Sequence, residues 1–117
     1  MPADELAFVP MRRYGQVLKL RAEHLDEYVR QHEAVWPDVL ARIRRSNIRN
    51  YSIFLRDGIL FAYLEYVGED FAADMREMAA DEATQRWWAL MEPMQEKWPT
   101  ASAEDWWTNM TEVFHAD

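Results

Sequence analysis

IRNYSIFLRDGILFAYLEYV, residues 48–67, holds two runs of strand-forming residues on either side of the dipeptide Asp57-Gly58. Asp-Gly favours a two-residue hairpin turn, because both central residues of that turn need positive φ. The second run is apolar at both parities: Ile59, Phe61 and Tyr63 alternate with Leu60, Ala62 and Leu64. A strand with one solvent-exposed face would alternate apolar and polar residues. The apolar residues at both parities therefore predict that the hairpin belongs to a sheet that is covered on both faces.

The chain before the hairpin changes from strand to helical periodicity near Arg21. Residues 14–20 alternate in part and are expected to form a first strand, whereas residues 21–35 place apolar side chains at helical spacing. Pro37 disfavours helical geometry at the residue before it but suits the first turn of a new helix. We therefore expect the chain to bend at Trp36 and to begin a second, short helix at Pro37.

The chain after the hairpin is expected to complete a small α+β domain. Helical spacing covers residues 69–80 and 81–98, and the tail is expected to return as a last strand from Met110 to Phe114. The order strand, helix, hairpin, helices, strand is that of a ferredoxin-like βαββαβ domain, with helices on one face of an antiparallel sheet. The other face of the sheet needs a cover, and we expect a second copy of the chain, packed sheet to sheet as a homodimer.

The length and composition fit one such domain. The chain has 117 residues, half of them apolar, which suffices for one hydrophobic core without disulfides or metals. Residues 1–13 contain two prolines and no clear period, so they are expected to form a flexible leader. Residues 14–117 are then the single domain.

Charge and residue usage disfavour several partners. The net charge is −8, from 21 acidic and 13 basic residues, which disfavours nucleic acid, anionic lipid and polyphosphate ligands. The chain has no cysteine, so it offers no thiolate nucleophile and no disulfide. It also has no run approaching the roughly 20 apolar residues of a membrane span and no export signal. We expect a cytoplasmic protein without membrane contact.

One histidine is placed where it could transfer protons. Tyr28 and His32 are i and i+4 neighbours on a helix face that is expected to point inward. An imidazole, with an unperturbed pKa near ~6.5, can take and give a proton around neutral pH. A core histidine that is satisfied by one hydrogen bond would have the same spacing. The spacing therefore leaves a structural and a catalytic role open.

The adjacent Trp87 and Trp88 are a second candidate. Neighbouring residues of a helix point in different directions, so one can pack in the core while the other lines a cavity. An indole face suits the apolar side of a sugar ring, and its N–H can still bind a hydroxyl. Two core tryptophans would show the same periodicity. The pair Trp106-Trp107 is expected in the core or an interface.

The sequence lacks the motifs of a phosphate-binding loop, a zinc site and a serine nucleophile. The three glycines are not grouped, so there is no phosphate-binding loop. The three histidines lack the spacing of a zinc site, and no serine has the context of a nucleophile elbow. The sequence favours a metal-free site with one proton-transfer residue among aromatic groups.

Four segments together resemble the L-rhamnose mutarotase family. They are HEAVWP at 32–37, RNYSIFLRDGILFAYLEY at 49–66, TQRWWALM at 84–91 and TEVFH at 111–115. A histidine shortly before Trp-Pro, an Asn-Tyr that enters a hairpin and a Trp-Trp after Gln-Arg stand in the family's order and approximate spacing. The resemblance extends from about Tyr14 to His115.

The resemblance implies a dimeric α/β barrel and a defined activity. Members of this family interconvert the α and β anomers of L-rhamnose in the cytoplasm, without a metal or cofactor. Carried over to this sequence, the proton donor falls on His32, and the sugar-contacting positions fall on Tyr28, Tyr51, Trp87 and Trp88.

The chain departs from the family pattern at two places. Glu33-Ala34 stands where the family often has Asn-Pro, and the last residues, 114–117, read FHAD where Phe-Tyr-Leu-Pro is common. A related 6-deoxy hexose such as L-fucose therefore stays open as the substrate. Two other functions of the same fold stay open as well: a cofactor-using dimeric α/β barrel monooxygenase with His32 as an iron ligand, and a non-catalytic dimer that binds a small ligand.

Overall fold

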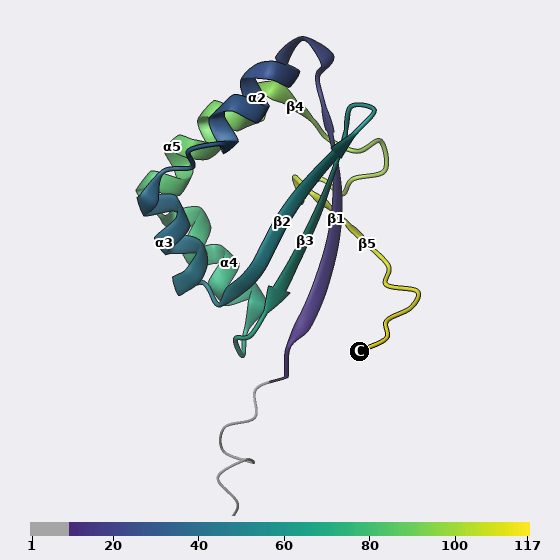
Figure 1. Ribbon diagram of the computed structural model, residues 1–117. Helices are drawn as coiled ribbons and strands as arrows, with labels where there is room; N and C mark the ends of the chain where they lie inside the picture. The colour runs from purple at the N-terminus through teal and green to yellow at the C-terminus, as the bar shows by residue number, and fades with distance from the viewer. Residues whose placement is uncertain (1–9) are drawn as a thin grey trace, which may run out of the picture.

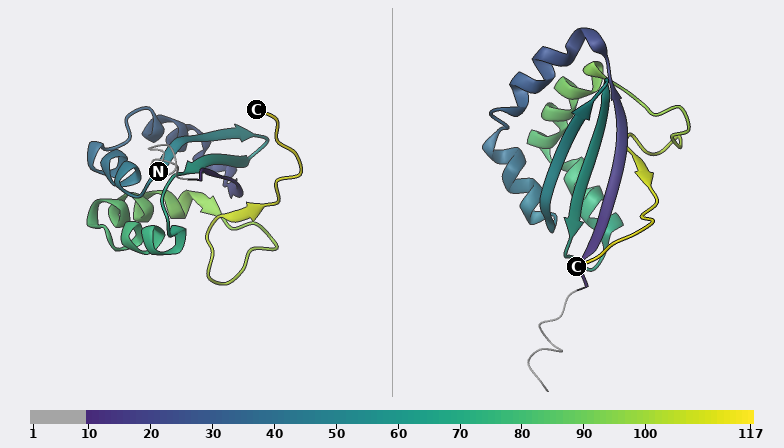
Figure 2. Two further views of the ribbon diagram at one scale, coloured as in Figure 1. Left: turned by 90° about the horizontal axis from the view of Figure 1, so that it is seen from below. Right: turned by 45° about the vertical axis from the view of Figure 1, so that its right-hand side comes forward.

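In the computed structural model, which describes residues 10–117, four α-helices cover one face of an antiparallel sheet (Figure 1). Figure 2 shows the helices together on one side of the strands. In chain order the elements are β1 (Arg12–Leu20), η1 (Ala22–His24), α2 (Leu25–His32), α3 (Pro37–Arg45), β2 (Ile48–Arg56), β3 (Ile59–Tyr66), α4 (Phe71–Ala80), α5 (Glu82–Met91), η2 (Glu92–Met94), β4 (Gln95–Glu96) and β5 (Thr108–Met110). Within the described range, no helix has the length and hydrophobicity needed to cross a membrane.

The strand order is β2-β3-β1-β4, which confirms the expected ferredoxin-like α+β fold. β1 pairs with β3 along most of its length, from Arg12 to Lys19. Its other edge is shared by two short strands, because β4 pairs with Lys19 and Leu20 while β5 pairs with residues 15–17. The fourth position of the fold is thus built from two separate segments.

The hairpin forms at the expected place. Asp57 and Gly58 have φ values of 53° and 73°, both positive as the turn requires. A bulge interrupts the pairing of β2 with β3 between Arg49 and Ser52, so one extra residue is inserted into β2. Asn50 adopts a φ of 49° in this bulge. Because the insertion changes the parity of the strand, it influences which face the neighbouring side chains occupy.

The core lies between the helices and one face of the sheet. Side chains of β1, β3 and the helices form its main cluster, whose buried members are Leu18, Leu20, Tyr28, Val39, Leu60, Trp87, Met91 and Met94. A smaller cluster contains Ile48, Leu64 and Met78. On the opposite face of the sheet, the cross-strand neighbours Phe54 and Phe61 are 64% and 37% exposed. Among the described residues, no helix packs on that face, and the second copy that was expected to cover it remains a prediction.

Several expected boundaries are wrong by a few residues. Residues 1–9 of the expected leader lie outside the described range, but Arg12 and Arg13 belong to β1, because they pair with Tyr66 and Glu65 of β3. The first helix does not fill residues 21–35: a 3-10 turn precedes α2, which ends at His32 before the bend at Trp36-Pro37.

The two C-terminal elements differ more from expectation. The helix expected over residues 81–98 ends at Met91, since Pro93 follows in a 3-10 turn and Gln95 then pairs with β1. The last strand covers Thr108–Met110 instead of the residues from Met110 to Phe114. Val113 and Phe114 are 93% and 81% exposed, so no packing within the described chain holds them in the sheet.

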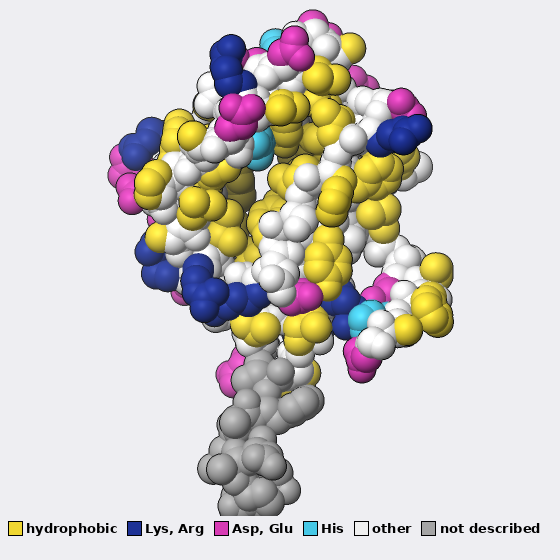
Figure 3. All heavy atoms as spheres, in the orientation of Figure 1, with side chains coloured by type: hydrophobic (Ala, Val, Ile, Leu, Met, Phe, Trp, Pro, Cys, Tyr) yellow, Lys and Arg dark blue, Asp and Glu magenta, His cyan; other side chains and the backbone are white. Residues whose placement is uncertain are grey.

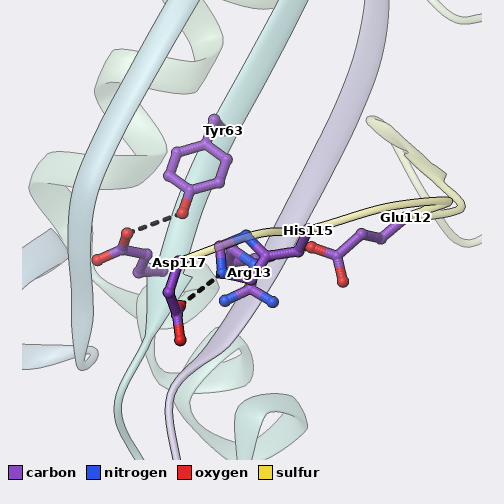
Figure 4. A network of polar contacts seen from close by, with 6 residues as sticks. Arg13, Tyr63, Glu112, His115 and Asp117 are labelled. Atoms are coloured by element: carbon purple, nitrogen blue, oxygen red, sulfur yellow. Dashed lines mark hydrogen bonds and ion pairs between the residues drawn. The ribbon is translucent and has the colours of Figure 1, made fainter.

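One of the polar contacts near the uncovered face ties the C-terminal tail to β1 (Figure 4). The Arg13 Nε donates to Glu112 Oε1 at 2.8 Å, and this hydrogen bond raises the pKa of Arg13 and lowers that of Glu112. His115 Nε2 lies 3.0 Å from Asp117 Oδ1, and the Tyr63 hydroxyl donates to a glutamate on its own strand. These groups are exposed or half-buried, and they are not among the residues that line the cavity described next.

Candidate active site

A cavity of about 150 Å³ lies between the sheet, α2, α5 and the segment that leads into β5. Figure 3 shows the opening between the helical layer and the sheet, which hydrophobic side chains surround. The aromatic and polar side chains that line the cavity are Tyr28, His32, Tyr51, Trp87, Trp88, Glu92, Gln95, Trp106 and Trp107. The structure therefore brings all five residues expected at the site, from α2, β2 and α5, into one cavity.

The cavity continues into a wider, mostly apolar hollow. This hollow has a volume of about 460 Å³ and lies between the sheet and helices α3, α4 and α5. His32, Tyr51, Trp87 and Trp88 line both spaces. Of the described residues, no lysine or arginine lines either space, so neither offers a cation to a phosphate group.

His32 has one ring nitrogen committed to the backbone. It is the last residue of α2, and its Nδ1 lies 2.8 Å from the carbonyl oxygen of Tyr28. A carbonyl can only accept a hydrogen bond, so Nδ1 carries the proton in this contact. The neutral ring therefore has its lone pair on Nε2, the nitrogen that is left for a ligand in the cavity.

Aromatic rings fix the imidazole from two sides. The ring centroid of Tyr28 lies 4.4 Å from that of His32, and the Trp87 ring meets it edge-on at 5.3 Å. Trp87 in turn contacts the ring of Trp36, at 5.1 Å and also edge-on. The bend at Trp36-Pro37 thus supports the wall that holds His32 in place. His32 is half-buried, so the question of a core or a reactive histidine is answered in part: the ring is packed, yet it also borders the cavity.

The two tyrosines are neutral hydrogen-bonding groups. Burial raises the pKa of Tyr28, whose side chain is 4% exposed, and a hydrogen bond from Gln95 partly opposes that shift. Burial also raises the pKa of Tyr51, and the proximity of Tyr28 adds to the effect. Tyr51 is 36% exposed as a whole, so the desolvation that raises its pKa acts on the hydroxyl end, inside the cavity. Both phenols keep their protons at neutral pH.

The adjacent tryptophans take different positions, as helical geometry requires. Trp87 is 6% exposed and belongs to the main core cluster with Met91 and Met94. Trp88 is 36% exposed. Both border the cavity, so one supports its wall from the core and the other contributes a more accessible indole face.

Four further aromatic and polar residues line the cavity that the sequence alone does not place there. Glu92 and Gln95 were assigned to an ordinary helix, whereas they lie where α5 gives way to η2 and β4. Trp106 and Trp107 were expected in the core or an interface, and they do pack against the core, but they also line the cavity. The available signal was a tryptophan pair in an otherwise polar tail, and no local pattern linked that pair to Gln95.

Comparisons with known proteins agree on one family. A family model described as L-rhamnose mutarotase matches residues 13–116. L-rhamnose mutarotases from Oceanobacillus iheyensis and Lactiplantibacillus plantarum are 33% and 36% identical to the chain over 109 residues, which is 92% of this chain and 100% of each relative. The L-rhamnose mutarotase of Bacillus subtilis is 35% identical over 86 residues, covering 72% of this chain and 80% of that protein.

Solved structures support the fold. The crystal structure of an L-rhamnose mutarotase from Formosa agariphila aligns with a TM-score of 0.70 at 24% identity, covering 91% of this chain and 99% of that one. A NIPSNAP family protein from Agrobacterium tumefaciens aligns with a TM-score of 0.59 at 16% identity, over 77% of this chain and 81% of that one.

Proposed function

The chain belongs to the L-rhamnose mutarotase family, and from this premise we propose that it is an isomerase that interconverts the α and β anomers of L-rhamnose. One observation carries the proposed mechanism: His32 borders an aromatic cavity, with Nδ1 bound to a carbonyl and Nε2 left for a ligand. Such a nitrogen can give and take a proton at the sugar while the ring stays in one orientation.

The reaction moves protons and needs no redox centre or covalent intermediate. Ring opening delivers a proton to the ring oxygen, breaks the bond between that oxygen and C1, and passes the proton of the anomeric hydroxyl to water, which leaves an aldehyde. Rotation about the C1–C2 bond and closure by the reverse steps give the other anomer. In this proposal protonated His32 donates from Nε2 to the ring oxygen and recovers the proton on closure. One acid–base group typically contributes 10²–10⁴-fold, or roughly 3–5 kcal/mol of barrier.

The other cavity residues would hold the sugar. Tyr28 and Tyr51 are neutral phenols, so each can donate a hydrogen bond to a sugar oxygen. Trp87 and Trp88 would cover the apolar face of the ring and its methyl group, where burial stabilises by about 25 cal/mol per Å². Since the described cavity walls hold no lysine or arginine, they suit an uncharged sugar better than a sugar phosphate.

A homodimer in the cytoplasm is the proposed working form, as the resemblance of the sequence implies. The uncovered face of the sheet supports the dimer, because it exposes the cross-strand neighbours Phe54 and Phe61 near the turn of the hairpin. A second copy packed on this face would bury both rings. Sedimentation should then give a species of twice the chain mass of 14.0 kDa, and a species of 14.0 kDa at micromolar concentration would contradict the dimer.

The activity is tested by anomer exchange in NMR. The α and β signals of L-rhamnose are followed by saturation transfer with and without the protein, and the same is done for L-fucose and for parent hexoses that carry a hydroxyl at C6. We expect strong acceleration for L-rhamnose and weaker acceleration for hexoses whose C6 hydroxyl would meet the apolar wall. No acceleration for any sugar would contradict the proposal. Binding of the sugar without faster exchange would identify a non-catalytic binding protein instead.

A further inference from the structure

Three side chains form a hydrogen-bonded row that ends at the cavity. The Trp106 Nε1–H donates to Gln95 Oε1 at 2.7 Å, and the Gln95 Nε2 donates to the Tyr28 hydroxyl oxygen at 3.0 Å. Gln95 is 5% exposed and Tyr28 is 4% exposed, so water does not compete freely for these groups. The row joins the segment before β5 to β4 and then to Tyr28 of α2, which is 67 residues from Gln95 in the sequence.

The direction of each hydrogen bond follows from the chemistry of its groups. An indole N–H can only donate, so the atom of Gln95 that faces Trp106 must be the amide oxygen. The amide nitrogen then faces Tyr28, and since it too can only donate, the phenol oxygen must accept. The proton of the Tyr28 hydroxyl therefore points away from Gln95.

The backbone around Gln95 keeps this row in register. Gln95 pairs with Leu20 in the sheet, and the amide of Arg21 donates to the Met94 carbonyl at 2.9 Å. The amide group is thus held by the sheet at its backbone and by Trp106 at its tip. A reversed amide would set its NH₂ against the indole N–H and leave two buried donors facing each other.

We propose that Gln95 and Trp106 are positioning residues, which orient Tyr28 as a hydrogen-bond donor toward an oxygen of the sugar. This inference rests on the proposed mutarotase function and deepens it. During ring opening the sugar oxygens exchange protons, and negative charge develops on the anomeric oxygen as its proton leaves. A phenol whose proton is already aimed into the cavity stabilises that charge without first having to reorient.

The substitution Gln95→Glu tests the donor-to-acceptor direction of the hydrogen bonds in this row, with little change in side-chain shape. An ionised carboxylate accepts from Trp106 but cannot donate, so the Tyr28 hydroxyl would turn and donate to it. A protonated carboxyl restores the original pattern, because its carbonyl oxygen accepts from Trp106 and its O–H donates to Tyr28. We expect anomer exchange to fall roughly ten- to hundredfold at alkaline pH, as for other outer hydrogen bonds that orient a reactive group. The ratio of variant to wild-type rate should recover as the pH falls.

Two controls separate positioning from simple damage. Gln95→Met has similar length but neither donor nor acceptor, so its rate ratio should be reduced at every pH without recovery in acid. In a Tyr28→Phe background, Gln95→Glu should have no further effect, since the row then ends on a ring without a hydroxyl. Circular dichroism checks that each variant is folded. If Gln95→Glu does not fold, Trp106→Phe serves in its place, because without the indole N–H the amide of Gln95 is free to turn. The loss of exchange rate caused by Trp106→Phe should then vanish in the Tyr28→Phe background.

Two results would overturn the inference. One is a rate ratio for Gln95→Glu that does not change with pH, and the other is an equal loss with and without the Tyr28 hydroxyl. The failure of the proposed function is distinguishable, because it shows in the wild type as a lack of faster exchange for any sugar. In that case the affinity for L-rhamnose is measured in place of the exchange rate. The affinity of Gln95→Glu should then depend on pH and on the Tyr28 hydroxyl in the same way.

Discussion

Replacing Trp87 and Trp88 one at a time compares two adjacent residues of one type that differ in burial. They are 6% and 36% exposed, and both line the cavity. On roughly 250 Å² of side-chain surface, at about 25 cal/mol per Å², this difference in exposure corresponds to about 2 kcal/mol. Trp87→Ala also removes edge-on contacts with the rings of His32 and Trp36. We expect Trp87→Ala to lower the free energy of unfolding by about 3–5 kcal/mol, the usual range for a core tryptophan.

The kinetic effects of the two substitutions should also differ. Trp88→Ala should cost about 2 kcal/mol less in stability than Trp87→Ala. It should raise KM for L-rhamnose more than it lowers kcat, because in the proposed role Trp88 covers the sugar and does not support the His32 ring. Trp87→Ala should lower kcat as well, since the His32 ring loses a supporting wall. Urea unfolding at one fixed protein concentration and exchange kinetics measure the two effects. If Trp88→Ala destabilises the protein as much as Trp87→Ala, the assignment of core and cavity roles is refuted. Trp87→Phe replaces the alanine variant if that variant is unfolded.

Further predictions concern the fold and the uncovered face. Burial and a hydrogen bond to Asp74 raise the pKa of Tyr66 to about 12, and the hydrogen bonds from Tyr66 and Asn47 lower the pKa of Asp74. We expect Tyr66→Phe to cost about 1.5–3 kcal/mol at neutral pH in urea unfolding. A carboxyl with a lowered pKa contributes stability above its unfolded value near ~3.9 and loses it as the pH falls through its folded value. The difference between Tyr66→Phe and wild type should therefore shrink in acid, and a gap that is constant with pH would contradict this role of Asp74. Phe54→Lys, which places a charge on the uncovered face, should shift sedimentation from the dimer toward the monomer while far-ultraviolet circular dichroism is unchanged; an unaltered dimer would place the interface elsewhere.

The parts of the fold that depend on local chemistry could be predicted from the sequence. The turn at Asp57-Gly58 follows from its need for two positive φ values, and the helix break follows from Pro37. The i, i+4 spacing of Tyr28 and His32 placed both side chains on one helix face, and the structure places them at one cavity.

The parts that depend on long-range pairing could not be predicted in this way. Gln95 lies in a segment with helical spacing, yet it forms a strand because the free edge of β1 is available to it. The same edge takes up Thr108–Met110, so the last strand forms earlier than the strand-forming residues Val113 and Phe114 indicate. The contact between Gln95 and Trp106 needs both segments in place, and neither segment alone contains a sign of it.

The central claim is that His32 transfers the proton, and anomer exchange of L-rhamnose by His32→Ala tests it most directly. His24→Ala is the matched control, because His24 is also half-buried but lies in η1 and does not line the cavity. With both variants folded, we predict that His32→Ala loses roughly 10²–10⁴-fold in rate and that His24→Ala keeps the wild-type rate. Equal exchange rates in folded His32→Ala and wild type would remove His32 from the mechanism.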